Sequence, residues 1–196
     1  MSDSLTSNRA MRRHWFPKPY ADAVARLRVP AGFVMVAAFA WFSHPDFTSL
    51  AIGIPLSACG LALRAWAAGH LAKNQRLAIS GPYSFTRNPL YLGTLITALG
   101  LAAAAPSIGL ALLFSVLFAV VYLPAIELEE QHLMAILPGY AAFAERVPLL
   151  APRWPRQFGP DRFSGALYRK NREYEALLGW LAGVALLIIK ASRVLN

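Results

Sequence analysis

The sequence has one cysteine and no recognisable metal-binding motif. With Cys59 alone, no disulfide can form within the chain. The histidines His14, His44, His70 and His132 show none of the short spacings typical of zinc ligands, so we expect no metal held by the protein. No glycine-rich phosphate loop and no pairing of a nucleophile with a base is evident. Chemistry through a covalent intermediate on the protein is therefore not expected.

Charge is also scarce. Only 15% of the 196 residues are charged and 57% are hydrophobic, and both values lie far from the average of soluble proteins. The mean hydropathy is +0.44, and the apolar residues occur in blocks. These features predict an all-α integral membrane protein with a single domain.

Two short loops, Ser43–Phe47 and Ala104–Ile108, contain no lysine or arginine, although the net charge is +9. Most of the basic residues lie before the first apolar segment, between the second and third, and between the fourth and last. This alternation follows the positive-inside rule and predicts that the N-terminus and the basic loops are cytoplasmic. Anionic lipid headgroups, rather than nucleic acid, are then the expected partners of the positive charge.

The apolar segments predict about five membrane helices. Residues 1–28 form a basic cytoplasmic segment, including a lead-in helix at Ala21–Arg28, and no signal peptide is expected. Four helices are predicted within residues 29–125: Val29–Phe42, Phe47–Gly69, Leu90–Ala105 and Ser107–Ala125, the last two as a tight hairpin. The first is short for a bilayer of about 30 Å.

A cytoplasmic segment of helices and loops is predicted for residues 126–173. The fourth helix is expected to continue past Pro124 with a kink, as Ile126–Leu137, and a short helix follows at Tyr140–Arg146. A last apolar helix at residues 174–190 either crosses the membrane or lies in its inner leaflet.

The stretch from Gly81 to Gly93 is the densest run of turn formers and aromatic residues. Asn88 and Pro89 predict a helix start, with Asn88 as the N-cap and Pro89 at the first helical position. A helix N-terminus attracts anionic groups. Arg87 and Tyr91 are four residues apart and are expected to share one face. A basic, aromatic loop that anchors a membrane helix is the simpler alternative.

Several ionised side chains occur where the membrane makes them costly. Arg64 lies inside the second predicted span, where a charge generally faces a partner or a wet cavity, although its side chain could also snorkel. Glu127 and Glu130 are one turn apart and are expected to point the same way, whereas Glu129 points elsewhere. Arg64 and Arg87 are candidate partners for these acids. A solvated helix face is the alternative for the acidic cluster.

Two motifs resemble a known superfamily. Residues 77–93, with Ser80-Gly81-Pro82-Tyr83 and Arg87-Asn88-Pro89-Leu90-Tyr91, resemble the signature LVxSGPYxxxRHPxYxG of integral-membrane methyltransferases. Residues 127–152 resemble a second signature, an acidic pair followed by YxxYxxRVPxxxP. The superfamily includes isoprenylcysteine carboxyl methyltransferases and phospholipid N-methyltransferases.

The resemblance implies a pocket for S-adenosylmethionine at the cytoplasmic membrane boundary, formed by the loop before the third span and the segment after the fourth. A lipophilic acceptor would enter between the helices. The implied cofactor-binding residues are Tyr83, Arg87, Asn88, Pro89, Tyr91, Gly93, Glu127, Glu130 and Arg146, and the implied catalytic residues are Arg64 and Glu129. Arg87 would hold the carboxylate of the cofactor, and a glutamate its ammonium. Arg64 would steer an anionic acceptor, which favours O-methylation of a carboxylate over N-methylation of a phospholipid.

The chain also departs from the signatures. Asn88 replaces a histidine, so an acid–base role at that position is lost. Leu128 stands where the first acid of the pair is expected, which leaves Glu129 as the matching acid. These departures keep open a non-catalytic membrane protein that uses the same fold to bind a lipid or a partner. A reductase related to sterol reductases is a further alternative, but no nicotinamide-binding element is evident.

Overall fold

A computed structural model describes residues 16–155 and 157–194, and all regular structure in this part of the chain is helical. The predicted all-α class is therefore confirmed. The elements are α2 (Lys18–Phe42), α3 (Phe47–Ala68), a 3₁₀ turn η1 (Gly81–Ser84), α4 (Pro89–Ala104), α5 (Ile108–Leu117), a π-helical turn η2 (Phe118–Tyr122), α6 (Leu123–Ile136), α7 (Tyr140–Arg146), α8 (Gly165–Lys170) and α9 (Tyr174–Val194).

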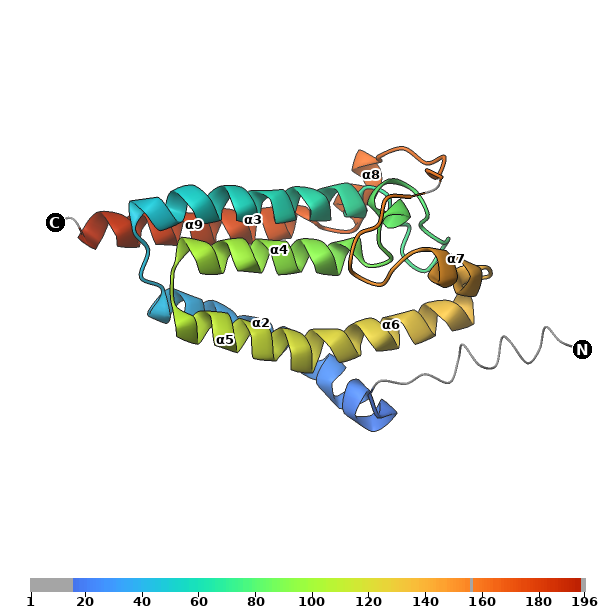
Figure 1. Cartoon of the computed structure of the whole chain (residues 1–196), viewed down its shortest axis with the longest axis horizontal. Helices are drawn as coiled ribbons and strands as arrows, with labels where there is room; N and C mark the ends of the chain where they lie inside the picture. The colour runs from blue at the N-terminus through green and yellow to red at the C-terminus, as the bar shows by residue number, and fades with distance from the viewer. Residues whose placement is uncertain (1–15, 156, 195–196) are drawn as a thin grey trace, which may run out of the picture.

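The helices form two layers that run along the long axis of the molecule (Figure 1). Helices α3, α4 and α9 make one layer, in which α4 and α9 both contact α3. Helix α2 and the continuous run α5–η2–α6 make the other layer. The elbow between α3 and α4, the helices α7 and α8 and their connecting loops gather at one end.

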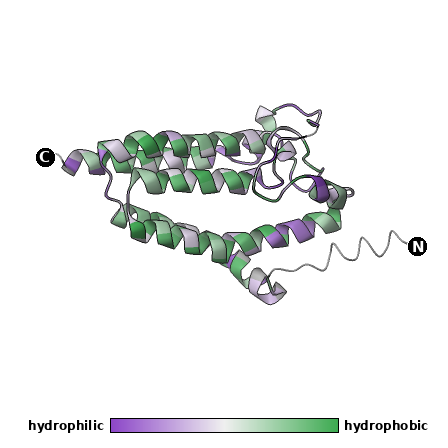
Figure 2. Ribbon diagram, in the orientation of Figure 1, coloured by the Kyte–Doolittle hydropathy of each residue, from purple (hydrophilic) through white to green (hydrophobic). Residues whose placement is uncertain are grey.

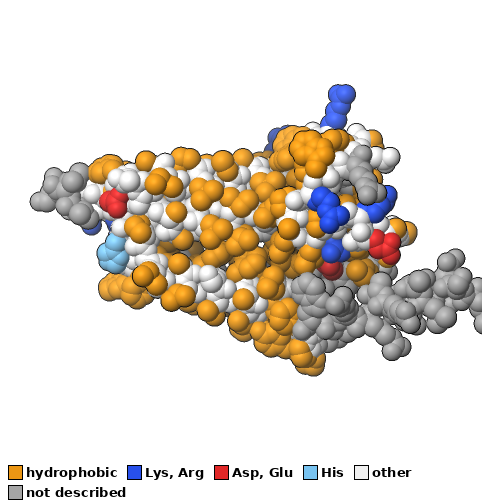
Figure 3. Space-filling view, viewed as in Figure 1, with side chains coloured by type: hydrophobic (Ala, Val, Ile, Leu, Met, Phe, Trp, Pro, Cys, Tyr) orange, Lys and Arg blue, Asp and Glu red, His pale blue; other side chains and the backbone are white. Residues whose placement is uncertain are grey.

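Three of the described helices are long and apolar enough to cross a membrane: Phe47–Ala68, Ile108–Ile136 and Tyr174–Arg193. Two shorter apolar helices, Pro30–Phe42 and Pro89–Ala104, accompany them. Apolar side chains cover most of the visible surface along the helices, whereas lysine and arginine gather mainly at the end formed by the loops (Figures 2 and 3). The arrangement is that of a membrane protein with one polar end, and the predicted count of five spans remains a prediction.

The second predicted helix agrees with the structure to within a residue, because its ends are set locally. At the start of α3, the Asp46 side chain accepts a hydrogen bond from the Ser49 backbone N–H at 2.8 Å, and the Ser49 hydroxyl bonds back to the Asp46 N–H. This reciprocal capping fixes the helix start. The lead-in helix and the first predicted span instead form one helix, α2, with Pro30 inside it.

The predicted continuation of the fourth helix past Pro124 is confirmed. A proline cannot donate to the carbonyl four residues back, here that of Val120. Just before this proline the helix widens into the π-helical turn η2, in which the Leu123 N–H donates to the Phe118 carbonyl, five residues back. The Val120 carbonyl accepts a bond from the Tyr20 hydroxyl at 3.0 Å. The carbonyl that the proline leaves without its usual donor is thereby bonded by a residue of α2.

The predicted hairpin of the third and fourth helices is wrong as a packing unit, because α4 packs along α3 rather than along α5. Small residues allow this close approach. A Cβ atom added to Gly60 would lie 2.6 Å from the Gly93 carbonyl oxygen, and one on Gly100 would lie 2.6 Å from the Ser57 Cα. Helix α9 joins the same face, where the Trp180 Nε1–H donates to the Ser57 hydroxyl at 2.9 Å.

Candidate active site

The elbow from Gly69 to Asn88 returns the chain from α3 to α4. Gly81 has a φ of +59°, a left-handed conformation that favours glycine, and a Cβ atom there would lie 2.7 Å from the His70 ring. Arg76 forms an ion pair with Asp161 at 2.8 Å, and the Asp161 backbone N–H donates to the Ser80 hydroxyl at 3.1 Å. The loop after α7 therefore holds the elbow in place.

The predicted start of α4 at Pro89 is confirmed, but the Asn88 side chain does not cap the helix. Its Nδ2 instead donates to the Leu149 carbonyl at 3.2 Å, and the Thr86 hydroxyl donates to the same carbonyl at 3.0 Å. The Arg87 backbone N–H donates to the Pro148 carbonyl at 2.9 Å. The second motif is thus bonded directly to the first, and Asn88 is one of the residues that join them.

The acidic helix α6 also meets the elbow. Nη1 of Arg87 lies 3.2 Å from Oε1 of Glu130, and both side chains are only 14% exposed. The Tyr140 hydroxyl donates to the same Glu130 oxygen at 3.0 Å, and the Tyr91 hydroxyl donates to Oε2 of Glu129 at 2.8 Å. The structure therefore brings the elbow and the acidic helix into contact.

A pocket opens between these two segments, with a volume of about 590 Å³ including its open mouth. The elbow contributes part of the wall, from Leu71 to Ala78, and α6 and α7 contribute Leu133, Leu137, Tyr140 and Phe143. Six residues of the predicted site line it: Tyr83, Arg87, Asn88, Pro89, Tyr91 and Glu129.

Other residues of the predicted site lie elsewhere. Glu127 accepts a bond from the Phe16 backbone N–H at 3.1 Å, on the side of α6 that faces α2, and does not line the pocket. Gly93 is buried against Arg64 in the contact of α3 with α4. Arg146 is exposed, and its Nε donates to the Ala142 carbonyl of its own helix. The expected pairing of Glu127 with Glu130 does not match these contacts. Glu130 pairs with Arg87 and Glu129 accepts a bond from Tyr91, whereas Glu127 accepts a bond from the Phe16 N–H.

Two buried tyrosines keep their protons in this environment. Burial raises the pKa of Tyr83 above its ordinary value, and the negative charges of Glu129 and Glu173 raise it further. Burial and the charge of Glu130 likewise raise the pKa of Tyr140. Both phenols therefore stay neutral at physiological pH and can act as hydrogen-bond donors.

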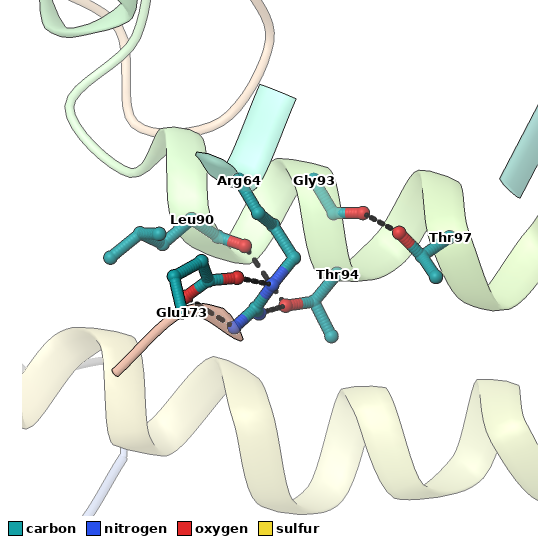
Figure 4. Close-up of polar contacts among 6 residues, drawn as sticks. All are labelled: Arg64, Leu90, Gly93, Thr94, Thr97 and Glu173. Carbon is teal, nitrogen blue, oxygen red and sulfur yellow. Dashed lines mark hydrogen bonds and ion pairs between the residues drawn. The ribbon is translucent and has the colours of Figure 1, made fainter. Parts of the chain in front are cut away.

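Arg64 has a partner that the sequence did not indicate (Figure 4). Its Nε and Nη2 donate to the two carboxylate oxygens of Glu173 at 2.6 and 3.1 Å, and Nη1 donates to the Thr94 hydroxyl. Glu173 is only 7% exposed and precedes α9. Arg64 therefore does not pair with the acids of α6. The one signal for Glu173 was an acid placed directly before an apolar helix, within a run of basic residues.

Comparisons with known proteins agree with the motifs. Residues 48–138 match the family model described as phospholipid methyltransferase. The chain is 35% identical over 115 residues to the cobalt-zinc-cadmium resistance protein CzcN of Cupriavidus metallidurans, an alignment that covers 58% of this chain and 52% of that protein. It is 34% identical over 116 residues to the nickel-cobalt-cadmium resistance protein NccN of Alcaligenes xylosoxydans xylosoxydans, covering 58% and 53%.

The chain thus spans about half the length of the curated relatives that it matches. No solved structure shows significant similarity to it. The matched segment runs from α3 to the end of α6 and so contains the elbow, Arg87 and the acidic helix. The resemblance seen in the two motifs is supported by this match: residues 48–138, a little less than half of the chain, fit the family model described as phospholipid methyltransferase.

Proposed function

We propose that the protein transfers a methyl group from S-adenosylmethionine to a lipophilic acceptor at the cytoplasmic face of a membrane. The observation that carries the proposal is the pocket between the elbow on one side and α6 and α7 on the other, lined by Arg87, which is paired with Glu130 of α6. When bound, S-adenosylmethionine supplies a sulfonium-activated methyl group for an in-line displacement. The protein's task is then to align the acceptor and to exclude water.

The lining residues suit such a donor. Nε of Arg87 is buried and has no hydrogen-bond partner among the described residues, although Nη1 of the same side chain is paired. A buried guanidinium N–H of this kind is costly unless it is bonded, and a carboxylate would satisfy it. Glu129 supplies a negative charge for a cationic group, and Tyr83 and Tyr91 supply aromatic surface that attracts cations.

Arg87 offers the sharpest test. Purified protein in detergent should bind S-adenosylhomocysteine, and Arg87→Ala should weaken that binding at least tenfold because the buried cation is removed. Arg169→Ala is the matched control, since this arginine of α8 is exposed, its Nε donates to the Gly165 carbonyl of its own helix, and it is not part of the predicted site; the variant should bind as the wild type does. Calorimetry measures both. The proposal fails if the wild type shows no binding.

A substitution of Arg64 distinguishes two classes of acceptor, a carboxylate and an amine. If the acceptor is a carboxylate that Arg64 binds, Arg64→Leu should abolish turnover; if it is an amine, little turnover should be lost. Mass spectrometry of lipids from cells with and without the protein reads the result as methylated products. The contact with Glu173 means that an anionic acceptor must compete for the guanidinium, which makes the amine a serious alternative.

The names of the two relatives connect them with resistance to cobalt, zinc, cadmium and nickel. Within residues 16–155 and 157–194, no group of three or more His, Cys, Asp or Glu side chains could hold a metal ion. We propose that any part this chain plays in metal resistance follows from methyl transfer to a lipophilic acceptor. A non-catalytic, lipid-binding protein of the same fold would add no methyl group in the lipid comparison above.

A further inference from the structure

The ion pair of Arg64 and Glu173 lies close to one end of a membrane helix, and neither residue lines the pocket described above. Arg64 is four residues before the end of α3 at Ala68, a distance of about 6 Å along a helix. An arginine at that depth lies within reach of the lipid headgroups. Its side chain is 24% exposed, whereas Glu173 is 7% exposed. Arg64 is therefore the partner that an outside molecule can reach, and Glu173 lies behind it.

Glu173 pairs with the Arg64 guanidinium through both of its carboxylate oxygens. Both carboxylate oxygens of Glu173 accept bonds from the guanidinium, which is the bidentate geometry with which arginine also binds phosphates and carboxylates. The Thr94 hydroxyl accepts a further bond from the guanidinium and donates its own hydrogen bond to the Leu90 carbonyl at 2.9 Å. Three of the five N–H groups of the guanidinium are thus used within the protein (Figure 4).

Glu173 is itself held in place by its surroundings. Two residues earlier, Nδ2 of Asn171 donates to the carbonyls of Ala68 and Leu71, each at 2.9 Å. These bonds fix the turn before α9 to the end of α3. A carboxylate placed in this way cancels the charge of Arg64 without depending on the flexible positions of surface side chains.

We propose that Glu173 sets the charge selectivity of the lipid position beside Arg64, by cancelling the cation so that anionic headgroups are not retained there. Glu173 is a positioning residue, since it acts through Arg64 and not on the reacting atoms. The proposal deepens the proposed function, because a lipid at this position is the acceptor or its competitor. It concerns lipid binding alone, so its test needs no methyl donor and can fail while methyl transfer stands.

The test is lipid retention from vesicles containing equal amounts of phosphatidylglycerol and phosphatidylcholine, read by native mass spectrometry. Glu173→Gln frees Arg64 and should raise the retained ratio of phosphatidylglycerol to phosphatidylcholine at least threefold. The double variant Arg64→Gln with Glu173→Gln should lose this gain. Glu175→Gln is the matched control: Glu175 is exposed and pairs with the exposed Arg172, so its loss should leave the ratio unchanged.

A reciprocal variant covers the case in which Glu173→Gln does not fold. Arg64→Gln leaves the Glu173 carboxylate unpaired and should lower the ratio at least threefold below that of the wild type. An unchanged ratio in both single variants would overturn the proposal, as would a gain that persists in the double variant. If neither single variant can be recovered folded, the pair serves to join α9 to α3, and the proposal is equally wrong.

Discussion

Two arginines near the elbow show how differently the same side chain can be used. Arg87 is paired with Glu130, and its buried Nε has no hydrogen-bond partner among the described residues. Its position is therefore fixed, and one of its donors lacks an acceptor. The guanidinium of Arg64 donates to both carboxylate oxygens of Glu173 and to the Thr94 hydroxyl. A ligand anion is therefore expected at Arg87, while Arg64 is balanced within the protein.

The buried tyrosine of the pocket gives a prediction for pH. The pKa of Tyr83 is raised in the folded protein, so the stability that its neutral form contributes is complete below about pH 10, its unfolded value, and is lost as the pH rises above it. The melting temperature in detergent should fall between about pH 9.5 and 11. In Tyr83→Phe the fall should be smaller, because no phenol titrates at that position. Equal slopes in the two proteins would contradict the argument.

At the scale of helices, the contact of α3 with α4 depends on the absence of side chains. A Cβ atom on Gly60 would lie 2.6 Å from the Gly93 carbonyl oxygen, and both helices present backbone there. Gly60→Ala should destabilise the protein by about 1–3 kcal/mol, the usual cost of overpacking. The displaced α4 carries Arg87 and Tyr91 at its start, so donor binding should weaken as well.

A glycine in α9 provides the control for this substitution. A Cβ atom on Gly179 meets nothing within 4 Å, so Gly179→Ala should be neutral or should stabilise the helix by up to about 1 kcal/mol. Thermal unfolding in one detergent compares the two variants. If Gly60→Ala unfolds at the wild-type temperature, the close packing of α3 and α4 is wrong.

Several helix ends could be predicted from the sequence because local chemistry sets them, although the ends between the lead-in helix and the first predicted span do not exist in α2. Pro89 begins α4, Pro138 and Gly139 separate α6 from α7, and the capping residues of α3 lie within four positions of one another. The partners of the helices could not be predicted in this way. Packing of α4 on α3 depends on matching small residues 33 or more positions apart, and Arg64 is 109 positions from Glu173. Such pairings leave no periodic signal in the sequence.

The molecule as a whole places its chemistry at one end. The pocket, Arg87, the acids of α6 and most lysines and arginines of the loops lie at the end opposite the turns at 43–46 and 105–107 (Figures 1 and 3). The positive-inside rule predicts that this end faces the cytoplasm. In the proposed function, a donor soluble in the cytoplasm and an acceptor dissolved in the membrane would meet at this end, where the pocket lies between the elbow and α6.

The most direct measurement of the central claim is an experimental structure of the protein with S-adenosylhomocysteine. Density for the adenosyl group should lie in the pocket between the Gly81–Tyr91 segment and α6–α7, with an anionic group of the ligand at Arg87. Density for the ligand at another site, or a saturated sample in which this pocket contains none, would contradict the account.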